Sequence, residues 1–218
     1  MHLDLIDKHY VFFVHQGQRG EIVLIVTNPL ACSIEIFCAD DVQLTIRVIL
    51  LLSPVADIKL SIIICGNRSI VSILGLCALV GSQTIQLKTS QIHCGKNTQS
   101  RLIVKSIVTD NASFMYDGMI RIQKDASQTY ALQNNKNILL SSMAKVISIP
   151  NIEVLNYDVQ CYHGAAISKF DQEQIQYMQS RCLPAPMIKQ LLVQAFFAEV
   201  LDMYEKKEFI LSTIYEKI

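Results

Sequence analysis

The sequence predicts a mainly β protein with a helical tail, and three observations support this class. Short segments rich in apolar and β-branched residues recur at intervals of roughly ten residues over most of the chain. Helical segments between them are missing, which disfavours an alternating β/α arrangement. After Ile167 the apolar residues change from the spacing of a strand to the spacing of a helix.

The β-rich part is divided by turn residues. Glycine, proline, asparagine and serine clusters separate the segments, and the cluster 133–137 is interpreted as one of the corners. The candidate strands are 10–14, 21–27, 33–37, 42–52, 58–65, 70–74, 84–88, 101–107, 118–123, 145–149, 151–155 and 159–163.

A sandwich, a barrel and a β-solenoid all produce many short strands at even spacing. The solenoid is favoured because tight hairpin turns are scarce, with Asp117-Gly118 the one Asp-Gly pair in a chain without Asn-Gly. Exact repeats are not visible, so the pattern alone puts the solenoid only slightly ahead.

The tail is expected to contain three helical segments. Asp171 is a good N-cap for a first helix that ends at Ser180, and 187–206 and 208–218 follow. The second segment is apolar on more than one side. Its extra apolar surface either packs on the β-rich body or docks a partner.

Composition limits the function classes. Of 218 residues, 51% are hydrophobic and 17% are charged, and 19 basic residues balance 19 acidic ones. A neutral chain of this kind is not expected to bind nucleic acid or anionic membranes. No basic segment precedes an apolar run at the start, so a cytoplasmic protein is expected. The apolar window 60–80 is interrupted by Asn67-Arg68, which argues against a membrane helix.

Seven cysteines, an odd number without a CxxC pair, are expected to be reduced thiols. Cys32, Cys38, Cys65 and Cys77 are interpreted as core residues. His93 and Cys94 are adjacent on a predicted strand and therefore point to opposite faces, so His93 is interpreted as structural.

The candidate chemical site is Cys161 and His163. Residues two apart on a strand point the same way, about 6.5–7 Å apart, so both side chains can reach one soft metal. Two ligands do not complete a shell of about four, so a partner chain must supply the others. The alternative is that Cys161 packs in the core and His163 is a hydrogen-bonded corner residue.

Several runs resemble a known family. The segments 151–154, 157–165 and 171–177, followed by Ser180-Arg181, resemble the C-terminal core of the SufB/SufD family, the scaffold subunits of the SUF iron–sulfur cluster assembly complex. Upstream, 117–120, 126–134 and 137–142 are similar to the buried-rung pattern of that family. Together these motifs cover roughly residues 93–200. The Cys-Tyr-His-Gly-Ala motif from Cys161 resembles the SufD branch.

The resemblance implies a fold and partners. The fold is a right-handed β-helix, here 1–168, followed by a C-terminal helical domain, 169–218. The β-helix pairs with a SufB-like subunit, although a homodimer stays open, and Cys161 and His163 share a transient iron–sulfur cluster or iron with that partner. The tail docks a SufC-like ABC ATPase, for which the candidate residues are Tyr177, Arg181, Phe196, Phe197, Glu199 and Val200.

The chain also departs from the family. It is short and is expected to lack most of the N-terminal helical region, and Ser168 and Cys182 stand where glycine is usual.

Three functions stay open at this point. The first is a non-catalytic scaffold subunit, since the chain has no P-loop of its own to hydrolyse ATP. The second is an enzyme with Cys161 as nucleophile and His163 as base, which parallel side chains on one strand disfavour. The third is a solenoid that binds proteins without metal or cluster.

Overall fold

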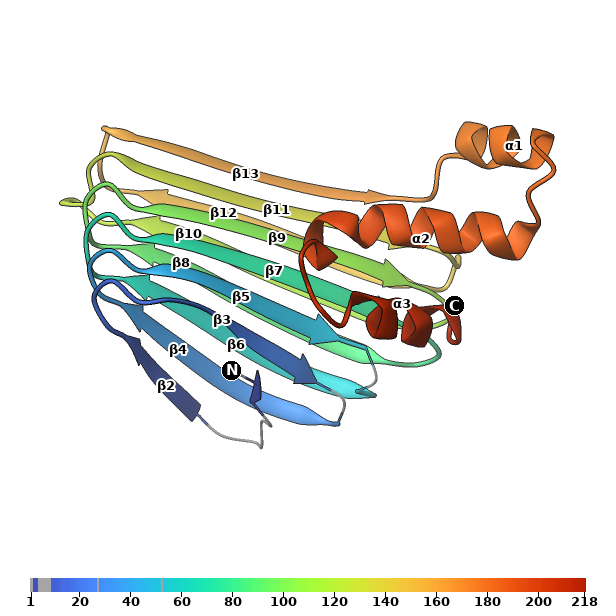
Figure 1. The fold of residues 1–218 in the computed structure, drawn as a ribbon, viewed down its shortest axis with the longest axis horizontal. Coiled ribbons are helices and arrows are strands. Elements are labelled where there is room, and N and C mark those ends of the chain that lie inside the picture. Colours follow the sequence, from blue (N-terminus) through green and yellow to red (C-terminus); the bar gives the residue numbers. More distant parts are fainter. Residues whose placement is uncertain (1, 4–8, 27, 52) are drawn as a thin grey trace.

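The chain folds into a flattened parallel β-solenoid that carries a helical tail (Figure 1). The computed structural model describes residues 2–3, 9–26, 28–51 and 53–218. Each rung of the solenoid contributes one strand to each of two sheets. Even-numbered strands form one sheet and odd-numbered strands form the other.

The strands follow one another in space in the order of the rungs. The seven-stranded sheet contains β1 (His2–Leu3), β3 (Arg19–Val26), β5 (Gln43–Leu50), β7 (Ile70–Leu79), β9 (Gln99–Val108), β11 (Thr129–Leu139) and β13 (Val159–Ser168). The six-stranded sheet contains β2 (His9–Val14), β4 (Leu30–Cys38), β6 (Val55–Ile64), β8 (Thr84–His93), β10 (Ser113–Ile122) and β12 (Lys145–Val154).

Neighbouring strands pair in register, so equivalent residues of successive rungs stack. Leu60 of β6 lies between Ile34 of β4 and Thr89 of β8, and all three side chains point between the sheets. Because side chains alternate along a strand, this register keeps the same positions buried in every rung.

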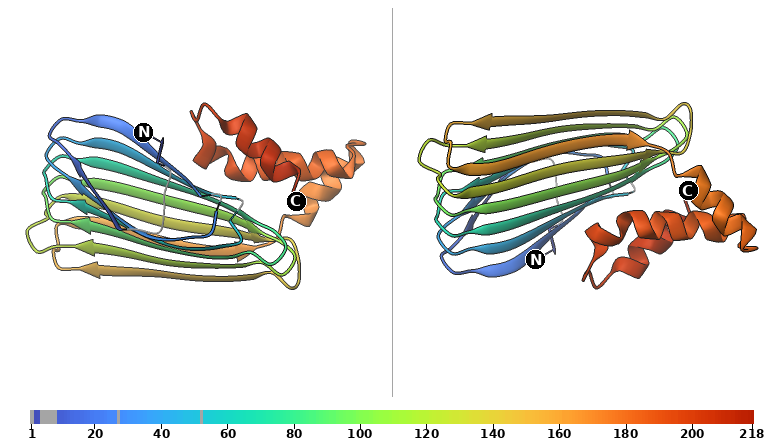
Figure 2. Two further views of the ribbon diagram at one scale, coloured as in Figure 1. Left: turned by 90° about the horizontal axis from the view of Figure 1, so that it is seen from below. Right: turned by 90° about the horizontal axis from the view of Figure 1, so that it is seen from above.

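The two sheets differ in their outer faces. Strands β4, β6 and β8 alternate between buried and partly exposed residues, which is typical of a sheet with one solvated face. Strands β7 and β9 are buried on both faces over most of their length. Helices cover the outer face of the seven-stranded sheet at these strands (Figure 2), which explains their continuous apolar runs.

The tail contains α1 (Gln172–Ser180), α2 (Ala185–Leu201) and α3 (Lys207–Tyr215). Helices α2 and α3 form a second core with the outer face of the sheet, in which Phe197 and Ile210 are buried against residues such as Ile103. Two cations of the sheet fix the position of α2. Arg47 donates to the backbone carbonyls of Val200 and Asp202, and Lys105 donates to the carbonyl of Phe196.

The predicted fold class is confirmed as a parallel β-solenoid followed by three helices. The two candidate strands 145–149 and 151–155 are one strand, β12, which tolerates Pro150 because it lies at the edge of its sheet. Thr27 and Leu52, the ends of two other candidate strands, lie outside the described residues. The division into two domains at residue 168 stays a prediction.

Three details of the sequence interpretation were wrong. The polar run 133–137 is not a corner but the middle of β11, where Gln133 faces the interior. The Asp117-Gly118 pair lies within β10 and is not a turn. The second helix ends at Leu201, and Met203 adopts the left-handed conformation with φ of 55°.

The predicted cap is confirmed, since Asp171 accepts from the backbone N–H of Glu173.

Among the residues described above, no helix has the length and apolar character needed to cross a membrane.

Candidate functional site

The last rung leaves two strand edges open. Within the described residues, β13 pairs only with β11 and β12 pairs only with β10, so each presents backbone groups that no further described strand covers. Large apolar side chains are exposed on and beside this rung. They are Met143, Ile147, Ile149, Val154, Leu155, Tyr157, Tyr162 and Ile167. An open edge with exposed apolar residues is a typical protein interaction surface.

Cys161 and His163 lie on this open rung. Both are on the inward face of β13, in register with Ala131 and Gln133 of the rung beneath. Cys161 is half-buried, whereas His163 is exposed. Burial raises the pKa of the Cys161 thiol to about 11, so this thiol is protonated at neutral pH. A metal would have to displace that proton in order to bind the sulfur.

Within the described residues, no group of three or more histidine, cysteine or acidic side chains could hold a metal ion. Cys161 and His163 therefore offer two ligands at most. A complete coordination shell at this position requires ligands from another molecule.

Beneath this rung the interior is polar. The His93 ring lies between two hydroxyl groups, with Nδ1 2.8 Å from Thr98 Oγ1 and Nε2 2.7 Å from Ser100 Oγ. Gln91 also donates to Ser100, at 2.6 Å. Burial lowers the pKa of His93 to about 4, which keeps the ring neutral. The interpretation of His93 as a structural residue agrees with these hydrogen bonds.

Gln133 lies directly under His163 and is completely buried. Neither its amide nitrogen nor its amide oxygen has a hydrogen-bond partner in the structure. Gly118 makes room for it, because a Cβ at this position would overlap the Gln133 amide and the Tyr116 hydroxyl. A buried polar group without a partner costs stability, so the retention of Gln133 requires an explanation other than packing.

A second polar cluster lies further along β11. Asn137 donates to Asn135 Oδ1 at 2.6 Å and accepts a hydrogen bond from Ser106, also at 2.6 Å. Ser148 of β12 donates to the same Asn135 oxygen at 2.7 Å. The sequence analysis missed these inward-facing amides. All five residues of 133–137 are polar, so the run lacks the strand-like alternation that would have shown which side chains face inward.

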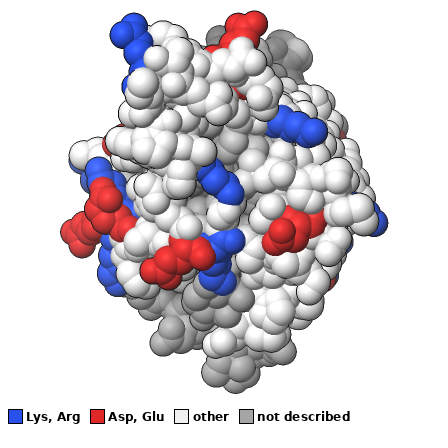
Figure 3. Space-filling view, turned by 90° about the vertical axis from the view of Figure 1, so that its right-hand side faces the viewer, with Lys and Arg blue, Asp and Glu red and all other residues white. Residues whose placement is uncertain are grey.

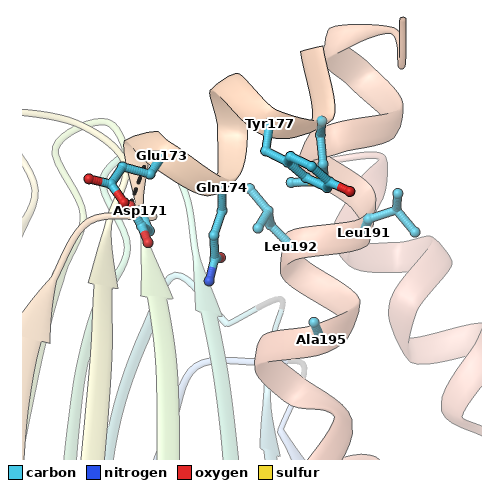
Figure 4. A pocket seen from close by; sticks show the side chains of 8 residues that line it. Asp171, Glu173, Gln174, Tyr177, Leu191, Leu192 and Ala195 are labelled. Atoms are coloured by element: carbon cyan, nitrogen blue, oxygen red, sulfur yellow. Dashed lines mark hydrogen bonds between the residues drawn. The ribbon is translucent and has the colours of Figure 1, made fainter. Parts of the chain in front are cut away.

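The helical tail carries a groove between α1 and α2 (Figure 4). Its volume is about 580 Å³, and its lining is mainly apolar. Tyr177 projects over it from α1, and Leu191, Leu192 and Ala195 contribute from α2. No residue of α1 is buried, so this helix stands away from the sheet.

The candidate docking residues fall into two groups. Tyr177 is exposed, with the Arg181 guanidinium 5.3 Å from its ring centre, and Glu199 lies at the surface between Arg101 and Lys105. Phe196 is partly buried. By contrast, Phe197 and Val200 are buried against the sheet, so they are not available for a surface contact. Their apolar spacing reflects the inner face of α2.

Charges are scattered over the helical end of the molecule in small groups of both signs (Figure 3). Glu199 illustrates the pattern, since it pairs with Arg101 at 2.6 Å and with Lys105 at 2.9 Å. These two cations hold the pKa of the Glu199 carboxyl below its usual value, against the opposing effect of partial burial. The visible face has no extended patch of one sign.

The interpretation of the cysteines needs one correction. Cys32, Cys38 and Cys77 are core residues as expected, but Cys65 is exposed. Strand β6 ends at Ile64, whose side chain points inward, so the side chain of the following residue, Cys65, points outward. Cys182 adopts a left-handed conformation with φ of 58°, which explains why glycine is usual at that position.

The fold, the open rung and the grooved tail define a parallel β-solenoid with a helical appendage, an architecture that offers extended surfaces. Within this class, the chain belongs to the family described as SUF system FeS cluster assembly, SufBD core domain, whose model matches residues 31–196.

The relatives include proteins named SufD. The iron-sulfur cluster assembly protein SufD of Escherichia coli is 31% identical over 137 residues, which cover 63% of this chain and 32% of that protein. SufD of Bacillus subtilis is 29% identical, with 56% and 28% covered. Protein ABCI7 of Arabidopsis thaliana, described as chloroplastic, is 32% identical, with 59% and 27% covered. The matched segment spans less than a third of each of these relatives, and the predicted SufD-like character is confirmed.

Proposed function

We propose that the chain is a non-catalytic, SufD-like scaffold subunit in iron–sulfur cluster assembly. It pairs with a SufB-like subunit through the open rung and with a SufC-like ABC ATPase through the helical tail. The observation that carries the proposal is the position of Cys161 and His163 on a terminal rung whose two strand edges are free and whose apolar side chains are exposed. The cytoplasmic location expected from the sequence stays a prediction.

The proposed chemistry of this site follows from its incomplete set of metal ligands. Cys161, once deprotonated, supplies a thiolate to iron and His163 supplies an imidazole, and the partner subunit supplies the rest of the shell. The cluster is cargo that forms and leaves, so an incomplete set of ligands favours its release. The raised pKa of Cys161 adds to this, because a proton competes with the metal for the sulfur.

The groove between α1 and α2 is the proposed contact for the ATPase. Tyr177 offers a large exposed ring at its edge, and aromatic residues of this kind often dominate binding energy. Glu199 and Arg181 lie nearby on the same two elements of the tail and add polar contacts.

The first test is co-purification of the tagged chain with the SufB-like subunit and the ATPase, with measurement of bound iron and sulfide. Ile149→Glu should remove the SufB-like subunit, because a charge replaces an exposed apolar residue on β12. Ile70→Glu is the matched control, since Ile70 is similarly exposed but lies on β7 inside its sheet. Equal loss of the partner in both variants would contradict pairing through the open rung.

The second test separates the cluster from assembly of the complex. Cys161→Ser and His163→Ala should leave the three-subunit complex intact and reduce its iron content several-fold. Cys182→Ser, at an exposed cysteine outside the open rung, should have no effect. If the complex assembles and iron is unchanged in both site variants, the chain is a binding module without metal or cluster.

The third test concerns the tail. Tyr177→Ala should weaken binding of the ATPase about tenfold or more, as expected for an aromatic hot spot. Phe209→Ala is the control, because Phe209 is an equally exposed aromatic residue on α3, outside the groove. A selective effect of the control would place the contact on α3 instead.

A further inference from the structure

Two successive turns of the solenoid carry equivalent cysteines. Cys65 follows the last residue of β6, Ile64, and Cys94 follows the last residue of β8, His93. Ile64 and His93 are register partners, and the backbone N–H of Cys94 donates to the carbonyl of Ile64 at 2.9 Å. The two cysteines therefore stack on adjacent rungs, at the end of the solenoid away from the helical tail.

The backbone holds these two turns close together. A Cβ on Gly95 would overlap the carbonyl of Gly66, the residue that follows Cys65, so the turns are packed backbone against backbone. The N–H of Lys96 donates to the Asn67 side chain at 2.8 Å, and the N–H of Arg68 donates to the carbonyl of Lys96 at 3.0 Å. The spacing of the two turns is thus fixed near the distance between paired strands, about 4.8 Å.

The two thiols are close neighbours, since burial raises the pKa of the Cys94 thiol and Cys65 contributes to raising it further. Cys65 is exposed and Cys94 is partly exposed, so small molecules can reach the pair. A Cα separation of about 4.8 Å lies inside the range of 4.4–6.8 Å that disulfides require.

Other uses of the two cysteines fit less well. A metal site is disfavoured because no third suitable side chain joins them among the described residues. Cys38 is near Cys65, but it points into the apolar core and is buried. Burial and the neighbouring Cys65 raise the pKa of the Cys38 thiol to about 12, so it is a poor competitor for Cys65.

We propose that Cys65 and Cys94 form a reversible disulfide between adjacent rungs when a low-molecular-weight disulfide, such as oxidised glutathione, is present. The Cys65 sulfur loses its proton and attacks the small disulfide, whose S–S bond breaks and releases one thiol. The Cys94 sulfur then loses its proton and attacks Cys65, and the second small thiol leaves. The two cysteines lose two electrons, and the small disulfide gains them.

The order of attack follows from exposure, since Cys65 is the more accessible sulfur. Burial, together with the neighbouring Cys65, raises the pKa of the Cys94 thiol. The second attack should therefore accelerate as the pH rises above neutral, because the fraction of thiolate increases.

The test is treatment of the full chain with oxidised glutathione, alkylation of the remaining thiols and digestion with trypsin without reduction. Cys65 and Cys94 fall in different peptides, 60–68 and 89–96, because Lys59, Arg68, Lys88 and Lys96 flank them. Mass spectrometry should find these two peptides joined, and dithiothreitol should separate them. The oxidised chain should also melt a few degrees higher than the reduced chain, because the bond closes a loop in the unfolded state.

Matched variants make the outcome decisive. Cys65→Ser and Cys94→Ser should each abolish the joined peptides and the shift in melting temperature, while Cys182→Ser should preserve both. In the chain without substitutions, a glutathione adduct that stays on Cys65 would overturn the proposal. So would a bond from Cys65 to Cys38 or to a second molecule, or complete alkylation of both cysteines.

Discussion

Between β4 and β7 the space between the two sheets is filled by Ile, Leu, Val and Cys side chains, whereas between β8 and β11 it contains many hydroxyl, amide and imidazole groups. We call these regions the apolar half and the polar half. The backbone and register are the same in both, so the difference lies in the side chains alone. The apolar half is stabilised by burial of apolar area, and the polar half depends on matched hydrogen bonds.

The polar half is explained better by function than by stability. An apolar interior would stabilise every rung, yet the polar half begins a few rungs below Cys161 and His163 and reaches them through Gln133. Polar groups retained where apolar ones would pack better are expected at functional sites. The polar half is therefore the part of the solenoid most closely connected with the proposed function.

The largest effect is expected in the apolar half. Leu60 is completely buried, so Leu60→Ala should reduce the free energy of unfolding by about 4 kcal/mol. Denaturant titration followed by circular dichroism measures this loss. A loss below about 1 kcal/mol would mean that the rungs collapse around cavities, and the contrast between the halves would be much weaker.

The polar half should respond to pH through His93. Its folded pKa, about 4, is below the unfolded value of about 6.5, so its contribution is complete above pH 6.5 and is lost as the pH falls toward 4. The loss should be about 3 kcal/mol at pH 4 and below. Carboxyl groups titrate in the same range, so the quantity to measure is the difference between the native chain and His93→Gln. Equal pH slopes for both would contradict a neutral, buried His93.

A smaller loss is expected for Asn137→Ala. The substitution leaves the Ser106 hydroxyl without its acceptor and removes one of the two donors to Asn135 Oδ1, which should reduce the free energy of unfolding by about 2 kcal/mol. Asn134, three residues before Asn137 and on the outer face of β11, provides the control, and its replacement by alanine should change stability by less than about 0.5 kcal/mol. Equal effects would show that the polar cluster adds no stability of its own.

The smallest expected change in the free energy of unfolding is a gain in stability, at Gln133. Because the Gln133 amide has no partner, Gln133→Met should stabilise the chain by about 1 kcal/mol. The same variant should lower the iron content of the assembled complex if the polar half serves the site above it. A destabilised Gln133→Met chain would indicate that ordered water satisfies the amide.

The sequence was sufficient to predict the strands of the apolar half, because alternating residues such as Ile34 and Ile36 mark a half-buried strand without ambiguity. It failed at β11, where Gln133, Asn135 and Asn137 have the local signature of a turn. Asn135 and Asn137 have partners on other rungs, since Ser148 is 13 residues from Asn135 and Ser106 is 31 residues from Asn137. Local patterns cannot reveal such partners.

The candidate site was predicted only in part, because local spacing does not show which elements pack together. Spacing placed Cys161 and His163 on one face of a strand, as the structure has them. Spacing did not separate the inner face of α2, with Phe197 and Val200, from its outer face, because α2 is apolar nearly all round. The pairing of Cys65 with Cys94 depends on register, which only the stacked rungs define.

The connection between β13 and α1 is short. Only three residues, 169–171, separate the strand that carries Cys161 from a helix with no buried residue. Helix α2, in contrast, is fixed to the sheet by Arg47 and Lys105. A force applied to α1 therefore meets a rigid support on one side and the outermost, most easily detached strand on the other. If the proposed ATPase binds α1, this connection would transmit its movement to β13, the strand proposed to share the cluster.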